Sequence, residues 1–227
     1  LDSFIDENIP LMLLVCTKGL KERHWGDMEK ITGVDINWSP DANMDQMMEC
    51  GLQHHADAIE ETCVAATKEF SLEIAMDKME KEWEGMVFET KAYKESGTSI
   101  LGSVDDIQTV LDDQIVKAQA MAGSRYIKPY LKRIQHWEKI LTNMQDIVDE
   151  CLKVQSTWLY LEPIFSSEDI MRQMPKEGEL FRKVDAIWRS NMAATAADND
   201  CLHVSERDGI VDEMKSANEM LDVIQKG

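Results

Sequence analysis

Two cysteines and two histidines have the spacing that comes nearest to a metal site in this sequence. Cys50 and His54 are four residues apart, on one face of a possible helix, and His55 and Cys63 follow. A thiolate combined with imidazoles suits Zn²⁺. However, the sequence holds no short C-x₂₋₄-C or H-x₃₋₅-H pair of the kind found in structural zinc sites. We therefore interpret the histidines as solvent-facing and the cysteines as core residues, and we expect no metal ligand here.

Acidic side chains are the second set of candidates, because paired carboxylates hydrolyse glycosides and E-x-x-H pairs bind two metal ions in helical bundles. Acidic clusters occur at Glu80, Glu82 and Glu84, and at Asp105, Asp106, Asp112 and Asp113. No E-x-x-H motif is present, and among 43 acidic residues such clusters arise by chance. Solvated helix faces explain them better than an active site.

The remaining motifs and clusters do not indicate chemistry either. The sequence contains no phosphate-binding loop, no G-x-G-x-x-G and no H-E-x-x-H, G-x-S-x-G or EF-hand pattern. Six tryptophans are present, at Trp25, Trp38, Trp83, Trp137, Trp158 and Trp188. The last four lie on apolar stripes, which indicates core packing rather than a ligand box. Lys128, Lys132 and Arg133 form a small basic cluster, which fits a solvated face better than a docking site. We expect no catalytic, cofactor-binding or metal-binding residue.

Charge and composition exclude several classes of partner. The net charge is -19, which opposes binding to nucleic acid and to anionic membrane surfaces. Five well-separated cysteines without a C-x-x-C pair favour a reducing compartment. The longest apolar run, Ile9 to Cys16, is too short to span a bilayer. No signal peptide is apparent, and we expect the chain to be part of a longer polypeptide.

The elements that would position these side chains are mainly helices, because straight-chain residues abound while Gly and Pro number only 11 and 5. The N-terminal part predicts a helix over 4–18 with Asn8 and Pro10 as a start or kink, and a second over 20–32 ending at Gly33. Residues 34–43 predict a loop. A helical period then runs over 45–86 and slips at Ser71, which predicts two helices meeting there, with Ser71 as an N-cap.

The middle of the chain combines a hairpin with the strongest helical signal. Residues 86–101 predict a small two-stranded β-hairpin around the turn Lys94 to Gly97. Ser103 opens a helix that ends at Gly123. Residues 129–161 then predict one long central helix, stopping before Pro163, that would span roughly 50 Å at 1.5 Å per residue. Apolar residues recur along it at intervals of three or four, and the polar Gln155 is the one exception.

The C-terminal part predicts a short helix from Ser166 to Pro175, a helix over 176–197, a polar loop over 198–208 and a last helix from Ile210. The fold class is therefore mainly α: an elongated helical bundle rod with one long helix and one small hairpin. A subdivision into 1–70, 71–126 and 127–227 is suggested, namely N-terminal helices, a helix–hairpin–helix part, and the long helix with the C-terminal helices.

Four segments resemble the linker region of dynein heavy chains, also termed N-terminal region 2. They are LKERHWGDMEKITG (20–33), FSLEIAMDKMEKEWEGMVFE (70–89), VDDIQTVLDDQIVKAQAM (104–121) and VQSTWLYLEPIFSSEDI (154–170). The resemblance covers essentially all of 1–227, in order. The fourth segment, with Pro163 and Ser166-Ser167-Glu168, looks more like the axonemal type than the cytoplasmic one.

The resemblance implies a mechanical role without chemistry in this segment. In this family the linker is a helical rod over a ring of AAA+ modules, and nucleotide turnover in the ring drives a power stroke for microtubule-based movement. The implied partners are the AAA+ ring of the same heavy chain and other dynein subunits, without direct microtubule contact. ATP and Mg²⁺ would bind elsewhere in the full chain. The implied location is the cytoplasm and cytoskeleton, in the axoneme of a cilium or flagellum.

Two other classes of function stay open from the residues alone. One is a generic helical scaffold or tethering rod of the spectrin-like kind, in which a hairpin at 86–101 would have no use. The other is a helical-bundle enzyme with a metal centre, which would hold a stoichiometric metal ion. For a lever, we expect bending at loop 34–43 or near Pro163, and stiffness over 129–161.

Overall fold

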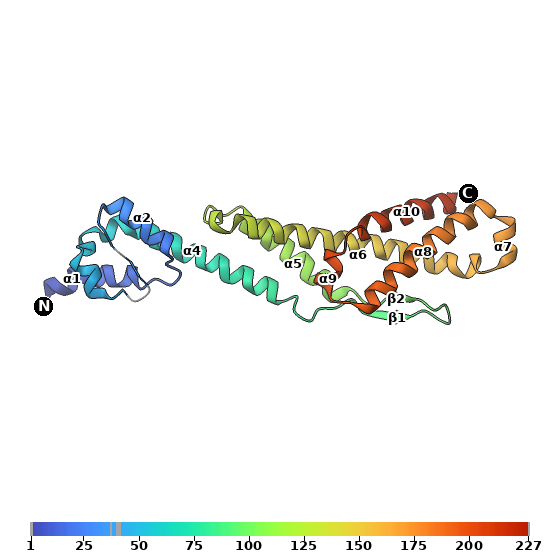
Figure 1. Cartoon of the computed structure of the whole chain (residues 1–227), viewed down its shortest axis with the longest axis horizontal. Coiled ribbons are helices and arrows are strands. Elements are labelled where there is room, and N and C mark those ends of the chain that lie inside the picture. Colours follow the sequence, from blue (N-terminus) through green and yellow to red (C-terminus); the bar gives the residue numbers. More distant parts are fainter. Residues whose placement is uncertain (1, 37, 40–41, 227) are drawn as a thin grey trace. The chain divides into compact units, whose positions relative to one another are not determined.

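The computed structural model describes residues 2–36, 38–39 and 42–226 and is mainly α-helical, as predicted (Figure 1). The α-helices are α1 (Asp2–Val15), α2 (Glu22–Thr32), α3 (Met44–Glu49), α4 (Ala56–Lys81), α5 (Asp105–Ala122), α6 (Leu131–Phe165), α7 (Glu168–Gln173), α8 (Pro175–Ala197), α9 (Cys201–Glu206) and α10 (Ile210–Lys226). Two 3-10 helices, η1 (Leu52–His55) and η2 (Lys128–Tyr130), and two strands, β1 (Thr90–Ala92) and β2 (Ser99–Leu101), complete the described part.

The chain forms two compact units. Unit 1 comprises Leu1–Lys78 together with Gly123–Leu131, and unit 2 comprises Met79–Ala122 together with Lys132–Gly227. The polypeptide thus passes between the units three times, once within α4 and once at each end of the α5–α6 connection. These boundaries differ from those of the subdivision into 1–70, 71–126 and 127–227, which stays a prediction.

Unit 1 is built around a small apolar core from its N-terminal helices. The buried members of this core are Leu11, Trp25, Met28, Ile36, Met47, Leu52, Ile59 and Cys63. Helix α2 ends as predicted, because Gly33 adopts a left-handed φ of 69° and its N–H bonds to the carbonyl of Glu29. Helix α1 begins at Asp2, so Asn8 and Pro10 do not mark its start. The described residues of the predicted loop 34–43 lack regular structure, while Asn37, Pro40 and Asp41 lie outside the described residues.

A glycine allows close packing between the α1–α2 connection and α4. Gly19 has a φ of +95°, and a Cβ atom added there would lie 2.4 Å from the Cβ atom of Phe70. Any other residue would therefore be strained and would also collide with the side chain beneath it.

Helix α4 is continuous through Ser71, so the predicted break at this residue is wrong. The Ser71 hydroxyl donates to the carbonyl of Thr67 at 2.9 Å, the back-bonding that lets serine sit inside a helix. The slip in period has another cause. Ile59 and Cys63 are buried in the core of unit 1, whereas Met79 is buried in unit 2, so each part of the helix follows the packing of its own unit.

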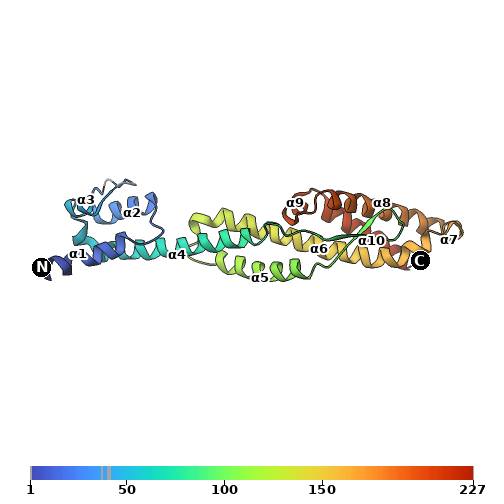
Figure 2. The same ribbon diagram turned by 90° about the horizontal axis from the view of Figure 1, so that it is seen from below.

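Unit 2 is a bundle around α6, with α5, α8 and α10 beside it (Figures 1 and 2). Helix α6 has 35 residues, about 52 Å at 1.5 Å per residue. Its buried residues form one seam: Ile134, Trp137, Leu141, Met144, Ile147, Val148, Cys151, Val154, Trp158, Leu161 and Phe165. Leu131 is exposed, contrary to the predicted stripe. The helix also continues past Pro163 to Phe165, so the predicted stop before this proline is wrong. The Ser166 hydroxyl donates to the carbonyl of Pro163, one of the last-turn carbonyls that lack a partner within the helix.

The predicted hairpin is confirmed, with strands shorter than expected. Strands β1 and β2 pair antiparallel, with Thr90 opposite Leu101. The residues just before β1 pair elsewhere: Val87 forms a bridge with Asp200, and the N–H of Phe88 donates to the carbonyl of Asn199 at 2.8 Å.

The predicted polar loop over 198–208 is wrong for its central part, which is helix α9. Asp200 caps this helix by accepting hydrogen bonds from the N–H groups of Leu202 and His203. Within the helix, the side chains of Cys201 and Val204 are buried. A helix of six residues is too short to show a period, which is why its polar sequence was misleading.

Candidate functional site

The four residues considered for a metal site lie in different environments. Cys63 is buried in the core of unit 1, and burial raises the pKa of its thiol to about 11. The thiol of Cys50 is half-buried and donates to the carbonyl of Met47 at 3.0 Å, while His54 is exposed. Over the ranges that the structure describes, no group of three or more His, Cys, Asp or Glu side chains is placed to hold a metal ion.

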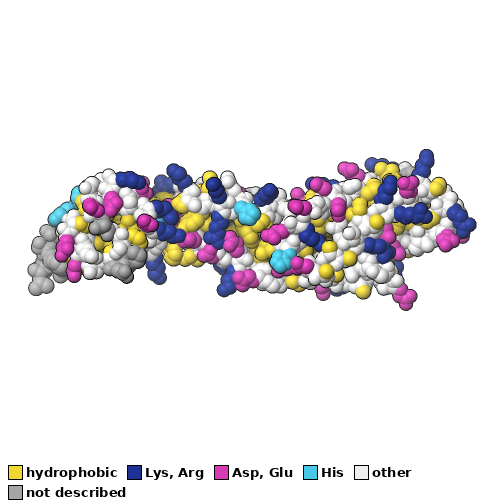
Figure 3. Space-filling view, viewed as in Figure 1, with side chains coloured by type: hydrophobic (Ala, Val, Ile, Leu, Met, Phe, Trp, Pro, Cys, Tyr) yellow, Lys and Arg dark blue, Asp and Glu magenta, His cyan; other side chains and the backbone are white. Residues whose placement is uncertain are grey.

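The acidic and basic clusters separate into individual contacts. Glu80 forms a two-pronged ion pair with Arg133, at 2.9 and 2.8 Å, and Glu82 accepts from the amide of Gln114 at 2.9 Å. Acidic and basic side chains are interspersed over the face seen in Figure 3. Glu80 and Glu82 thus bond to different partners, as carboxylates on separate helix faces do.

The tryptophans of α6 and α8 belong to the packed interior. The rings of Trp158 and Trp188 stack with centroids 5.9 Å apart, and Tyr93 of the hairpin meets Trp158 edge-on at 5.2 Å. Both tryptophans are fully buried, so this aromatic row fixes the hairpin to α6 and α8 rather than lining a ligand site.

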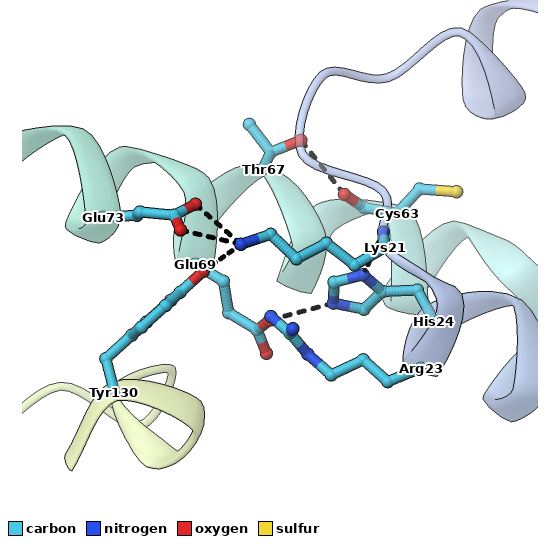
Figure 4. Close-up of polar contacts among 8 residues, drawn as sticks. All are labelled: Lys21, Arg23, His24, Cys63, Thr67, Glu69, Glu73 and Tyr130. Atoms are coloured by element: carbon cyan, nitrogen blue, oxygen red, sulfur yellow. Dashed lines mark hydrogen bonds and ion pairs between the residues drawn. The ribbon is translucent and has the colours of Figure 1, made fainter. Parts of the chain in front are cut away.

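What the structure does bring together is a polar cluster in unit 1, here called the polar clamp: Lys21, Arg23, His24, Glu69, Glu73 and Tyr130 (Figure 4). Lys21 is the N-cap residue of α2, the two glutamates lie on α4, and Tyr130 ends η2. The Nζ atom of Lys21 lies 2.7 and 2.9 Å from the two carboxylate oxygens of Glu73, and donates to the Tyr130 hydroxyl at 2.9 Å. Three segments distant in sequence therefore meet at one ammonium group.

The second half of the clamp surrounds Glu69. His24 Nε2 lies 2.9 Å from the Glu69 carboxylate, and the Arg23 guanidinium pairs with the same oxygen. The other imidazole nitrogen of His24, Nδ1, accepts the backbone N–H of Lys21 at 2.9 Å. Because Nδ1 accepts, the proton of the neutral ring is on Nε2 and points to Glu69. This buried histidine thus links the start of α2 to α4.

The electrostatics of the clamp follow from the Lys21–Glu73 contact. The hydrogen bond from Lys21 lowers the pKa of the Glu73 carboxyl, and the hydrogen bond to Glu73 raises the pKa of Lys21. Both groups therefore stay charged over a wide pH range. The guanidinium of Arg23 and the ammonium of Lys21 also lie 5.9 and 5.3 Å from the centroid of the Tyr130 ring.

In unit 2, a buried amide joins three helices. Gln114 of α5 is wholly buried, and its carbonyl oxygen accepts from the indole N–H groups of Trp83 at 2.9 Å and Trp137 at 3.3 Å. Its amino group donates to the carbonyl of Met79 and to the carboxylate of Glu82, both at 2.9 Å. Met79 lies in the last turn of α4, where carbonyls lack partners within the helix. Gln114 therefore also gives a hydrogen-bond donor to a carbonyl at the end of α4.

A second amide holds the hairpin to the long helix. Gln155, the polar lapse in the α6 stripe, accepts the N–H of Leu101 at 2.7 Å and donates to its carbonyl at 3.1 Å. Both backbone groups on the outer edge of β2 at this residue are thus satisfied. At the hairpin turn, Arg189 of α8 donates to the carbonyl of Ser96 at 2.6 Å.

Sequence reasoning missed these polar links. Gln114 lies within the apolar stripe of its helix, and Gln155 is the one polar residue in the stripe of α6. A glutamine at a core position of an otherwise apolar stripe was the available signal, because a buried amide needs partners. The Lys21–Tyr130 contact spans 109 residues, and no local pattern indicates it.

Taken together, the long α6 seam, the hairpin and the buried amides define a helical-bundle segment built to hold its helices in fixed register. The family model for the dynein heavy chain, N-terminal region 2, matches residues 2–227. The chain belongs to this family, which confirms the resemblance found in the sequence.

The most similar relatives include axonemal heavy chains. Dynein axonemal heavy chain 3 of Mus musculus is 41% identical over 221 residues, covering 97% of this chain and 5% of that protein. Dynein axonemal heavy chain 12 of Homo sapiens is 42% identical over 208 residues, covering 92% of this chain and 7% of that protein. Dynein axonemal heavy chain 1 of Mus musculus is 39% identical over 221 residues, covering 96% and 5%. The chain thus spans 5 to 7% of the length of these curated relatives.

Proposed function

We propose that this chain is a mechanical segment of the linker of an axonemal dynein heavy chain, and that it transmits ATP-driven changes of the AAA+ ring into a power stroke. The match to N-terminal region 2 over residues 2–227 carries the proposal. The full chain would act in the axoneme of a cilium or flagellum, in microtubule-based movement. Its partners would be the ring of the same heavy chain and other dynein subunits, and this segment would not touch the microtubule.

The construction of unit 2 supports a load-bearing role. A lever must resist bending, and α6 presents a buried residue at nearly every turn over its 35 residues. Burial of a side chain such as Leu or Phe contributes about 1.5–3 kcal/mol, so bending that opens this seam is opposed along its whole length. We assign no chemistry to this segment: ATP and Mg²⁺ would be bound by other parts of the heavy chain.

Softening α6 without disturbing its core tests this function in the full heavy chain. Thr142, Asp146 and Asp149 are exposed on α6. Replacing all three by glycine weakens the helix by about 3 kcal/mol relative to replacing all three by alanine, at about 1 kcal/mol per site. The alanine variant is the matched control, because it removes the same side chains and charges.

We expect the glycine variant to drive microtubule gliding several-fold more slowly than the alanine variant, while both hydrolyse ATP at the same basal rate. Equal gliding velocities would contradict the proposal and would favour a scaffold that carries no load. Residues 129–161 should also superpose between two nucleotide states of the motor, with bending at loop 34–43 or near Pro163. A bend in the middle of α6 would contradict this assignment of stiffness.

A further inference from the structure

Arg207 carries a charge that is largely buried in unit 2 and has no ion-pair partner among the described residues. It lies in the connection between α9 and α10, and its Nη2 atom donates to the Thr195 hydroxyl at 2.7 Å. Its Nε and Nη1 atoms are buried and have no hydrogen-bond partner. Burial lowers the pKa of this guanidinium, and the carboxylates of Asp198 and Glu213 act on it from beyond ion-pair distance. A buried guanidinium ordinarily pairs with an anion, so these free donors mark a potential anion site.

A pocket of about 410 Å³ lies beside this cation, between α6 and the start of α10. Arg207 forms part of its wall, and His136 and Lys139 line it from α6. The two walls are held together, because the side-chain amide of Asn143 in α6 donates to the carbonyl of Ser205 in α9 at 2.7 Å (Figure 1). The first turn of α10 also lines the pocket, and its N–H groups have no partners within the helix and favour negative charge. Hydrogen-bond donors therefore face the pocket from both walls.

Three carboxylates line the same pocket and decide which anion fits. Glu206, Asp208 and Asp212 are all exposed. Water screens exposed charges, whereas an anion is attracted much more strongly to a buried guanidinium, where the effective dielectric constant is lower. An extended acidic peptide or a nucleic acid would have to lie across these carboxylates, which would repel it. A compact oxoanion needs contact only with the cationic part of the wall.

We propose that this pocket binds a phosphate dianion, either free or as a small phosphate monoester, through Arg207, Lys139 and the first turn of α10. The long side chain of Arg207 can turn its guanidinium from Thr195 into the pocket and present two N–H groups to two oxygens of one phosphate. A bond to a neutral hydroxyl is thereby exchanged for charge-assisted bonds, which are roughly twice as strong. Ligand pockets measure roughly 300–1,000 Å³, so this one also admits a small group attached to the phosphate.

Hydrogen–deuterium exchange measures binding at this site in the purified full-length heavy chain without nucleotide. The readout is the exchange of the amides in 203–213, during titration with inorganic phosphate and, as a control, with potassium chloride of equal ionic strength. Since opening of this segment competes with binding, exchange should slow about tenfold when phosphate reaches about ten times its Kd. With two or more charge-assisted bonds, we expect a Kd of roughly 1 mM or below.

A second titration with glycerol phosphate distinguishes the two sources of the phosphate group. Slowing by inorganic phosphate assigns the site to the free ion, and slowing by glycerol phosphate alone assigns it to a monoester. No slowing by either compound up to about 20 mM, or equal slowing by chloride, would overturn the proposal.

Three variants show whether any slowing comes from the pocket. Arg207→Met should abolish it, and Lys139→Met should raise the Kd several-fold. Arg172→Met is the matched control, because Arg172 of α7 is an exposed arginine outside the pocket, and its Kd should equal that of the parent chain. Lys139 is exposed, so its replacement leaves the interior intact, and an unchanged Kd in Lys139→Met would overturn the proposal, as would unchanged slowing in Arg207→Met. Because no motility is measured, the outcome is independent of the power stroke.

Discussion

Replacing the buried amide of α5 by an apolar side chain should destabilise unit 2 far more than its size suggests. In Gln114→Leu the side chain stays close in volume, but four hydrogen bonds are lost. Two of them leave the indole N–H groups of Trp83 and Trp137 without an acceptor in the interior. A third leaves the carbonyl of Met79, at the end of α4, without its donor. The partner of the fourth, Glu82, is exposed and regains water.

The magnitude follows from these orphaned groups. Leaving a buried donor or acceptor unsatisfied costs about 1–3 kcal/mol. Three such groups would cost about 3–9 kcal/mol if they were additive, and local relaxation reduces the sum for neighbouring groups. The added apolar burial of leucine recovers about 1–2 kcal/mol. We therefore expect a net loss of about 2–5 kcal/mol in the free energy of unfolding.

Urea unfolding followed by tryptophan fluorescence measures this loss, since Trp83 and Trp137 are direct partners of the amide. Gln119→Leu on the same helix is the matched control, because Gln119 is exposed. Its effect should stay within about 0.5 kcal/mol. If both variants unfold at the same urea concentration, the four bonds of Gln114 do not stabilise the bundle and the reasoning fails.

Three further predictions concern other contacts. In Gln155→Leu the two backbone groups of Leu101 lose their partners, so we expect its amide to exchange hydrogen at least tenfold faster by NMR or mass spectrometry; unchanged exchange would contradict the role of Gln155. Tyr130→Phe keeps the ring but removes the hydroxyl that accepts from Lys21, and should cost about 0.5–1.5 kcal/mol. In a double-mutant cycle with Lys21→Met, a coupling energy near zero would show that this bond contributes nothing. Burial raises the pKa of the Cys151 thiol to about 12 from 9.0. The stability that comes from keeping this thiol neutral is therefore complete below pH 9 and is lost as the pH rises toward 12. Above pH 9, the free energy of unfolding of the parent chain should fall by about 1.4 kcal/mol per pH unit more than that of Cys151→Ala. Parallel curves of this free energy against pH would contradict the prediction.

The sequence predicted those elements whose signal repeats over many residues. The seam of α6 was predictable because eleven buried positions share one helical period, and only its ends were displaced. The hairpin was predictable because strand-forming residues flank a turn with a glycine. The end of α2 at Gly33 was predictable because a left-handed residue there favours glycine.

The failures have a common physical origin, which is that tertiary contacts override local pattern. The slip at Ser71 predicted a break, yet α4 continues, because its two parts pack within different units and each follows its own set of partners. Helix α9 has a polar sequence, but a cap at Asp200 and the burial of Cys201 and Val204 stabilise it. The tertiary contacts that stabilise α4 and α9 cannot be predicted from the residues next to them in the sequence.

Buried amides explain how such a bundle keeps one register. Apolar contacts along α6 are non-directional, so they bring helices together without specifying how far one may slide past another. Gln114 and Gln155 do specify this, because each bonds named groups on a neighbouring element at 2.7 to 3.3 Å. A slide of one helical turn, about 5.4 Å, would break all of these bonds at once. The polar residues of the core therefore resist sliding, while the apolar seam resists separation and bending, and the lever role proposed above needs both.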